Sequence, residues 1–247
     1  MWGKMKINIF FAAILVICLF ATSCSHQDPP PPDNGIKAMN PLLPPGAHVV
    51  RDDENDTIIQ LKGADLSAGL ESNSHFRRLQ AQGRAAELAV AFIEAHAGFF
   101  RLADPSSELS AVSEKTCDLG LTRVRFQQIY QGIPVSNAEI NVHIDRNNRV
   151  YLVNGRYIPT PTQIDVNPGI TSKTAISVAA GHLGIAGDDL PRRAIDLVVF
   201  ANRETGPRLS FRIETAIRAD QGWVYYIDAN SGEILERQGT TRFLPAD

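Results

Sequence analysis

The best candidate for metal chemistry in this sequence is a pair of polar residues, Glu94 and His96, within the run RAAELAVAFIEAHA at residues 84–97. A zinc-peptidase helix carries two histidines four residues apart, with a glutamate beside the first, so that both ligands lie on one helical face. The first histidine of that pattern is missing here. We therefore expect His96 to be a surface residue of an ordinary helix.

Four carboxylates in the range 52–56 could bind calcium, but the run lacks the glycine and the closing glutamate of a twelve-residue calcium loop, which favours a solvated loop. His143 alternates along a predicted strand with Glu139 and Asp145, and we expect these three side chains to lie on its solvent side. Cys117 has no base nearby in the sequence and is expected to be a small buried hydrophobe.

Other catalytic signatures are missing from the sequence as well. It contains no GxSxG nucleophile elbow, no glycine-rich phosphate loop and no cluster of cysteine, histidine and carboxylate at metal-ligand spacing. We therefore predict no catalytic residue, no metal site, no cofactor and no enzymatic activity.

Composition and charge narrow the choice of partner. The 247 residues are 44% hydrophobic and 21% charged, which is typical of a globular protein and excludes disorder over the whole chain. The formal net charge of -3 leaves no overall basic field for neutralising phosphates, so nucleic acid is not expected as a partner.

The N-terminus has the pattern of an export signal. Lys4 and Lys6 precede the apolar run 7–20, and Ala21-Thr22-Ser23 places small residues directly before Cys24. This arrangement resembles the lipobox of bacterial lipoproteins, although Ala21 stands where leucine is usual; the alternative is a plain secretory peptide. The resemblance implies that residues 1–23 are removed, that Cys24 carries a membrane lipid anchor, and that the protein faces outside the cytoplasm in the bacterial cell envelope. The proline-rich residues 24–47 are expected to form an extended tether.

Hydrophobic periodicity predicts an α+β fold with two antiparallel-sheet units, each with a helix packed on one face. Three alternating runs in the range 121–157 predict strands, with a hairpin loop at 145–149, and the range 84–97 predicts the first helix, ended by Gly98. Thr171 should cap a second helix at 172–184, followed by strands near 197–201, 209–217 and 223–227 and a turn at 228–232. The predicted domains are 48–158 and 159–238, with a flexible tail at 239–247.

The run TRVRFQQIYQGIPV at residues 122–135 resembles the hallmark strand of the fungalysin/thermolysin propeptide (FTP) domain. The stretches EINVHID at 139–145 and VNG at 153–155 continue that pattern. Residues 136–138, SNA, stand where the family has a short glycine-containing turn, and still permit a turn. The stretches RLSFRI at 208–213 and GWVYYIDANSGEI at 222–234 are similar to a PepSY domain.

These resemblances imply a protein that binds a secreted thermolysin-like metallopeptidase, assisting its folding and holding it inactive. The candidate contact residues are Arg125, Phe126, Gln127, Gln128, Tyr130 and Pro134, with Phe243 and Leu244 expected to enter the substrate cleft. Phe126 and Tyr130 could equally be core residues, and Pro134 could fix a strand end. Two other functions stay open: an envelope interaction module without a peptidase partner, and the pre-pro portion of a longer zinc metallopeptidase.

Overall fold

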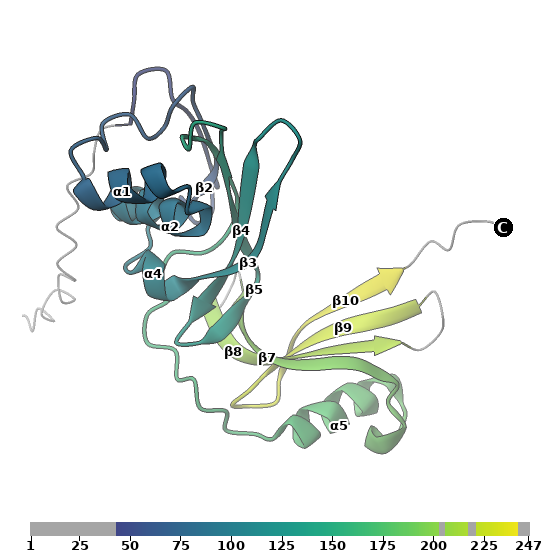
Figure 1. Ribbon diagram of the computed structural model, residues 1–247. Coiled ribbons are helices and arrows are strands. Elements are labelled where there is room, and N and C mark those ends of the chain that lie inside the picture. The colour runs from purple at the N-terminus through teal and green to yellow at the C-terminus, as the bar shows by residue number, and fades with distance from the viewer. Residues whose placement is uncertain (1–42, 203–205, 217–220, 242–247) are drawn as a thin grey trace, which may run out of the picture. The chain divides into compact units, whose positions relative to one another are not determined.

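The computed structural model describes residues 43–202, 206–216 and 221–241. The export signal, Cys24, most of the tether, and Phe243 with Leu244 lie outside the described residues. The described chain has the predicted α+β fold (Figure 1). Within these ranges, no helix has the length and apolar character needed to cross a membrane.

Six antiparallel strands form what we call the N-terminal sheet, in the spatial order β1-β2-β6-β5-β4-β3. The strands are β1 (His48–Arg51), β2 (Ile58–Lys62), β3 (Leu109–Thr116), β4 (Thr122–Tyr130), β5 (Ile133–Ile144) and β6 (Val150–Arg156). Alternate residues of β4 and β5 are buried, as the period-2 pattern predicts.

Helices cover one face of the N-terminal sheet (Figure 1). They are α1 (Ser74–Gln82), α2 (Ala85–Ala95), α3 (Ala97–Phe100) and α4 (Pro105–Glu108), and α1 was not predicted from the sequence. The buried stripe of α2, including Leu88, Ala89 and Phe92, packs into the same core as Phe126 of β4. The expected stop at Gly98 was wrong, because α2 already ends before His96 and Gly98 lies inside α3.

Four further antiparallel strands form the C-terminal sheet, in the order β7-β8-β9-β10. They are β7 (Arg192–Asn202), β8 (Gly206–Ala216), β9 (Gln221–Asp228) and β10 (Ile234–Thr241), preceded by α5 (Ser172–Leu183) and the short 3-10 helix η1 (Gly187–Asp189). Thr171 caps α5 as predicted, since its side chain accepts a hydrogen bond from the Thr174 amide. Because β10 continues to Thr241, residues 239–241 are strand and not the start of a flexible tail.

The two sheets are joined through β5. Val135 pairs with Val199 of β7 in the parallel sense, and this pair links the two antiparallel groups into one sheet of ten strands. Tyr226 of β9 adds a side-chain link, because its hydroxyl lies 2.8 Å from the Ser136 hydroxyl. The start of β5 is therefore the junction between the two halves of the fold.

Two hairpin turns organise the central strands. The loop 145–149 was predicted correctly: the Asp145 amide donates to the Arg149 carbonyl at 2.8 Å, and Asn148 has the left-handed backbone. The turn between β4 and β5 consists of Gln131 and Gly132, both with positive φ. Residues 136–138, whose types still permit a turn, form none: β5 runs through them, and Asn137, at φ 58°, is a local irregularity within the strand.

Candidate functional site

Within the described part of the chain, no group of three or more His, Cys, Asp or Glu residues is arranged to hold a metal ion. The prediction that His96 lies at the surface was wrong, because its side chain is buried at the C-terminal end of α2. Its ring lies 4.6 Å from that of Phe92, and its Nδ1 lies 2.9 Å from the Phe92 carbonyl oxygen. Burial holds the pKa of His96 below its ordinary value, although this hydrogen bond raises it in part.

The expectation for Cys117 was also wrong, since this residue is exposed in the turn between β3 and β4. His143 lies on the polar side of β5, as expected, and its Nε2 is 3.0 Å from the Asn154 side-chain oxygen. Partial burial lowers the pKa of His143, the Asn154 contact raises it, and the positive charge of Arg123 lowers it further. Asp145 has a separate role, because its carboxylate accepts the amides of Asn147 and Arg149 in the turn.

Within the hallmark strand β4, Phe126 and Gln128 face the core. Phe126 is 1% exposed and Gln128 is fully buried. The Gln128 amide donates to the Ile158 carbonyl at 2.8 Å and accepts the Ile158 backbone N–H at 3.0 Å. These two bonds attach the segment that leaves β6 to the end of β4. The burial of this polar side chain is therefore compensated by two hydrogen bonds to the backbone of a single residue, Ile158.

Gln127 faces away from the helices and supports the irregular start of β5. Its Nε2 lies within 2.9 Å of the carbonyl oxygens of Gln128, Val135 and Ala138. Because one amide nitrogen has two hydrogens, at least one hydrogen is shared between two of these acceptors. Val135 and Ala138 lie on either side of the irregularity at Asn137, where the pairing of β4 with β5 is interrupted. Gln127 therefore donates hydrogen bonds to carbonyl oxygens that the regular strand pairing does not satisfy.

The remaining predicted contact residues are more accessible. Pro134 is exposed at the start of β5, and Tyr130 is half-buried against the N-terminal core. Arg125 lies 3.7 Å from the Glu139 carboxylate, while its Nε is buried without a hydrogen-bond partner. Pro134, Gln127 and Glu139 line a cavity of about 660 Å³ together with residues of β7 and β8, including Arg212. The hallmark run 122–135 thus presents Pro134 at the junction of the two sheets, whereas Arg125, which pairs with Asn141 of β5, lies farther along the N-terminal sheet.

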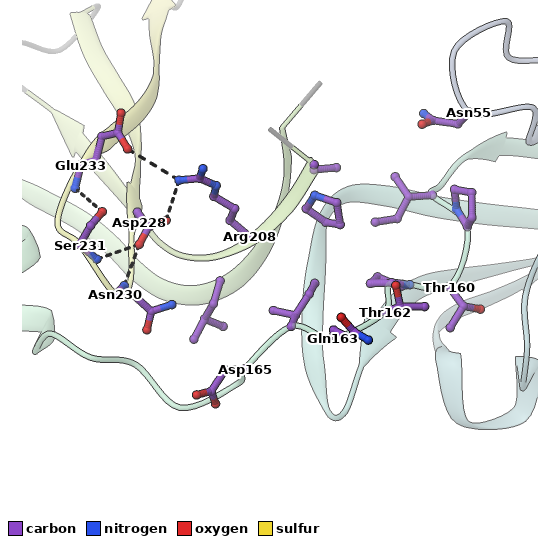
Figure 2. A pocket seen from close by; sticks show the side chains of 18 of the residues that line it. Asn55, Thr160, Thr162, Gln163, Asp165, Arg208, Asp228, Asn230, Ser231 and Glu233 are labelled. Carbon is purple, nitrogen blue, oxygen red and sulfur yellow. Dashed lines mark hydrogen bonds and ion pairs between the residues drawn. The ribbon is translucent and has the colours of Figure 1, made fainter. Parts of the chain in front are cut away.

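A larger groove of about 1210 Å³ lies along the segment 158–165, which connects the two sheets (Figure 2). Its opposite wall contains Arg208 of β8, which pairs with Asp228 at 3.2 Å and with Glu233 at 3.7 Å. The other carboxylate oxygen of Asp228 accepts the amides of Asn230 and Ser231, each at 2.8 Å. Burial alone would raise the pKa of Asp228, but these hydrogen bonds and Arg208 outweigh it and lower the pKa. The cluster is consistent with a structural role, closing the turn between β9 and β10.

The helix-free face of the N-terminal sheet, which we call the open face, is the site that the sequence analysis missed. Strand register places a row of six residues across all six strands, and we call it the cationic row. Its members, in order from β3 to β1, are Lys115, Arg123, His143, Leu152, Lys62 and His48. Over the whole open face, five cationic side chains (Lys62, Lys115, Arg123, Arg125 and Arg156) accompany one carboxylate, Glu139. The alternation in β4 indicates that Arg123 and Arg125 share one face of the sheet. The other members of the row could be found only from the pairing of strands that are distant in the sequence.

Comparison with known protein families identifies both halves of this fold. Residues 107–157 match the Fungalysin/Thermolysin Propeptide Motif, and residues 169–238 match the family described as Peptidase propeptide and YPEB domain. The chain therefore carries an FTP segment followed by a PepSY segment, in the order that the sequence motifs predicted. Both segments are of the propeptide type.

The chain matches part of several longer curated relatives. The chain is 24% identical over 156 residues to "Bacillolysin" of Bacillus subtilis (strain 168), which covers 60% of this chain and 30% of that protein. It is 27% identical over 164 residues to "Thermolysin" of Bacillus caldolyticus, which covers 61% of this chain and 29% of that protein. The matched part thus spans less than a third of the length of these curated relatives.

Two solved structures give weaker matches. The "Bacillus megaterium YpeB C-terminal domain" is 11% identical, with a TM-score of 0.37 over 79% of this chain and 83% of that chain. A "putative lipoprotein (CD1622) from Clostridium difficile 630" is 14% identical, with a TM-score of 0.24 over 59% of this chain and 91% of that chain. Similarity at this level identifies no function.

Proposed function

We propose that this chain is a non-catalytic propeptide-type protein that binds a thermolysin-like metallopeptidase in trans, inhibiting it, assisting its folding, or both. The observation that carries the proposal is the FTP segment followed by the PepSY segment, aligned with bacillolysin and thermolysin over about 60% of this chain. A preformed sheet that binds only the folded enzyme stabilises that enzyme by mass action, and no catalytic residue of its own is required.

We place the contact at the exposed part of the hallmark region. Arg125 and Pro134 are accessible, whereas Phe126 and Gln128 are inside the core and Gln127 holds the irregular start of β5. Phe243 and Leu244 are a second proposed contact, entering the substrate cleft of the enzyme. Removal of residues 242–247 leaves β10 intact and tests that contact separately.

The decisive experiment measures peptidase activity and refolding yield with the purified unit Ile36–Asp247, which is compact and contains the described cores. We expect slower substrate cleavage or a higher refolding yield for a co-encoded thermolysin-like enzyme. A matched control is the Arg77→Gln variant, whose change lies on the exposed side of α1. Unchanged cleavage and unchanged refolding at saturating concentration would refute the proposal.

The proposed location is the outer side of a bacterial membrane, with the protein held there by lipid on Cys24. The small residues 21–23 directly before this cysteine support the assignment. Metabolic labelling with a fatty acid should mark the parent chain and not Cys24→Ala, and equal labelling of both would contradict it. An envelope interaction module without a peptidase partner remains the alternative that pull-down experiments would favour if they recovered no peptidase.

The alignment with longer peptidases also fits a second proposal, that these residues are the pre-pro portion of a longer zinc metallopeptidase. The matched region spans about 30% of the peptidase relatives. Sequencing of the reading frame beyond Asp247 distinguishes the two, because an HExxH motif downstream would favour the pre-pro portion.

A further inference from the structure

The cationic row lies at the end of the open face that is distant from the C-terminal sheet. His143, in the row, is eight residues along β5 from Val135, which pairs with β7. Eight residues of strand span about 26 Å. The row is therefore separated from Pro134, whereas Arg125, the other proposed peptidase contact, lies two residues from Arg123 along β4 and is kept in the row variant described below.

The cations of the row are available for an external partner. Lys62, Lys115 and Arg123 are exposed, and none of them forms an ion pair with another residue in the described ranges. Neighbouring strands are about 4.8 Å apart, so the row extends about 24 Å across the six strands. The turns after β3 and β5 carry two carboxylates, Asp118 and Asp145, and two guanidinium groups, Arg146 and Arg149. The loop after β2 adds Asp65, whose carboxylate lies 3.6 Å from Arg149. These loops thus add no positive charge, and the row itself is positive.

The N-terminal end of the first strand, β1, lies in this row. His48 is the first residue of β1 and also the last member of the row, so the residues that lead back to Cys24 start from the same edge. His48 lies 24 residue steps after Cys24, and such a stretch can span no more than about 85 Å even when fully extended. A lipid on Cys24 would therefore hold the fold within about 85 Å of the membrane, with the tether leaving from the sheet edge at which the row ends.

We propose that the cationic row binds the anionic headgroups of a phospholipid membrane. A flat row of lysine and arginine matches a negatively charged lipid surface, where each such residue adds about 1 kcal/mol of attraction, equivalent to roughly five-fold in binding. The row has a single apolar member, Leu152, and no aromatic one, whereas the central part of a protein interface is enriched in aromatic side chains and depleted in lysine. A membrane therefore fits the row better than a protein surface does. The inference rests on the proposed lipid anchor for its location, and it is independent of any peptidase.

The test uses the unit Ile36–Asp247, which lacks Cys24, in sedimentation with vesicles of phosphatidylcholine alone or mixed equally with phosphatidylglycerol. We expect binding only to the mixed vesicles, and loss of that binding in 1 M salt, where the screening length falls to about 3 Å. The triple variant Lys62→Gln/Lys115→Gln/Arg123→Gln should bind about 100-fold more weakly, from three contributions of about five-fold each. The matched control Arg77→Gln/Arg78→Gln/Lys173→Gln removes three cations from helices α1 and α5 and should bind like the parent.

Circular dichroism and thermal unfolding of both triple variants establish that each is folded. Absence of binding to the mixed vesicles, or equal losses in the two triple variants, would overturn the proposal. Peptidase inhibition by the row variant is expected to equal that of the parent. If the row variant lost inhibition and the parent did not bind vesicles, the row would be a peptidase contact instead. Failure of inhibition with intact vesicle binding would refute only the proposed peptidase function.

Discussion

Replacement of Gln128 by alanine tests whether the hallmark glutamine holds the fold or contacts a partner. Gln128 is fully buried, and its amide makes two hydrogen bonds with the backbone of Ile158, at 2.8 and 3.0 Å. Each such bond contributes about 1 kcal/mol, and the unpaired backbone groups left behind cost about 1–3 kcal/mol in total. With the cavity included, we expect the free energy of unfolding to fall by about 2–4 kcal/mol.

Urea and thermal unfolding of the unit Ile36–Asp247 measure this change. A loss of 2–4 kcal/mol corresponds to a decrease in melting temperature of about 5–15 °C for a chain of this size. Gln128→Leu keeps most of the volume and should still cost about 1–3 kcal/mol, because Ile158 loses its partners. The control Gln82→Ala, on an exposed residue of α1, should change stability by less than about 0.5 kcal/mol. A Gln128→Ala protein of unchanged stability that inhibits at least ten-fold less well would refute a structural role.

Three further predictions concern stability. Burial lowers the pKa of His96 in the folded state, so the neutral side chain contributes stability above pH 6.5, and this contribution is lost as the pH falls below that value. In urea unfolding, the parent should therefore lose more stability between pH 7.5 and pH 5.5 than His96→Phe does. Equal losses in the two proteins would contradict this prediction. Gly155→Ala should destabilise by at least about 2 kcal/mol, because the added Cβ would lie 2.1 Å from the Glu139 carbonyl oxygen between β5 and β6; thermal unfolding close to that of the parent would show that the strands separate easily. Tyr226→Phe should cost about 1 kcal/mol by removing the contact with Ser136 that links the two sheets, and a double-mutant cycle with Ser136→Ala should show coupling, whereas full additivity would exclude this link.

Local sequence patterns predicted most of the strands. Alternation in the range 121–157 identified β4, β5 and β6, and the asparagines of the 145–149 loop identified its turn, because these signals depend on neighbouring residues alone. Thr171 likewise predicted the start of α5. The irregularity at Asn137 was not predictable in this way. It depends on Gln127, ten residues earlier, which supplies hydrogen bonds to the carbonyls on either side.

Burial of single residues was predicted less well than secondary structure. His96 was expected at the surface but is buried, because α3 and α4 follow α2 closely and the His96 ring packs on Phe92. Cys117 was expected in the core but is exposed, because a tight turn between β3 and β4 directs it outwards. Both errors have one cause: exposure depends on which elements pack next to a residue, and its own type carries little of that information.

The sequence by itself determined the class of protein, because the motifs at 122–135 and 222–234 are contiguous and can be recognised without the fold. It also determined the periodicity of the strands and the N-terminal cap of α5, Thr171. Only the tertiary structure decided where charge gathers. Lys62, Lys115 and Arg123 belong to three different strands, β2, β3 and β4. Antiparallel pairing of the strands brings the three side chains into one row, on a protein whose net charge is -3. Net charge sums over the whole chain, whereas a binding surface depends on register between strands, and register is a property of the folded sheet.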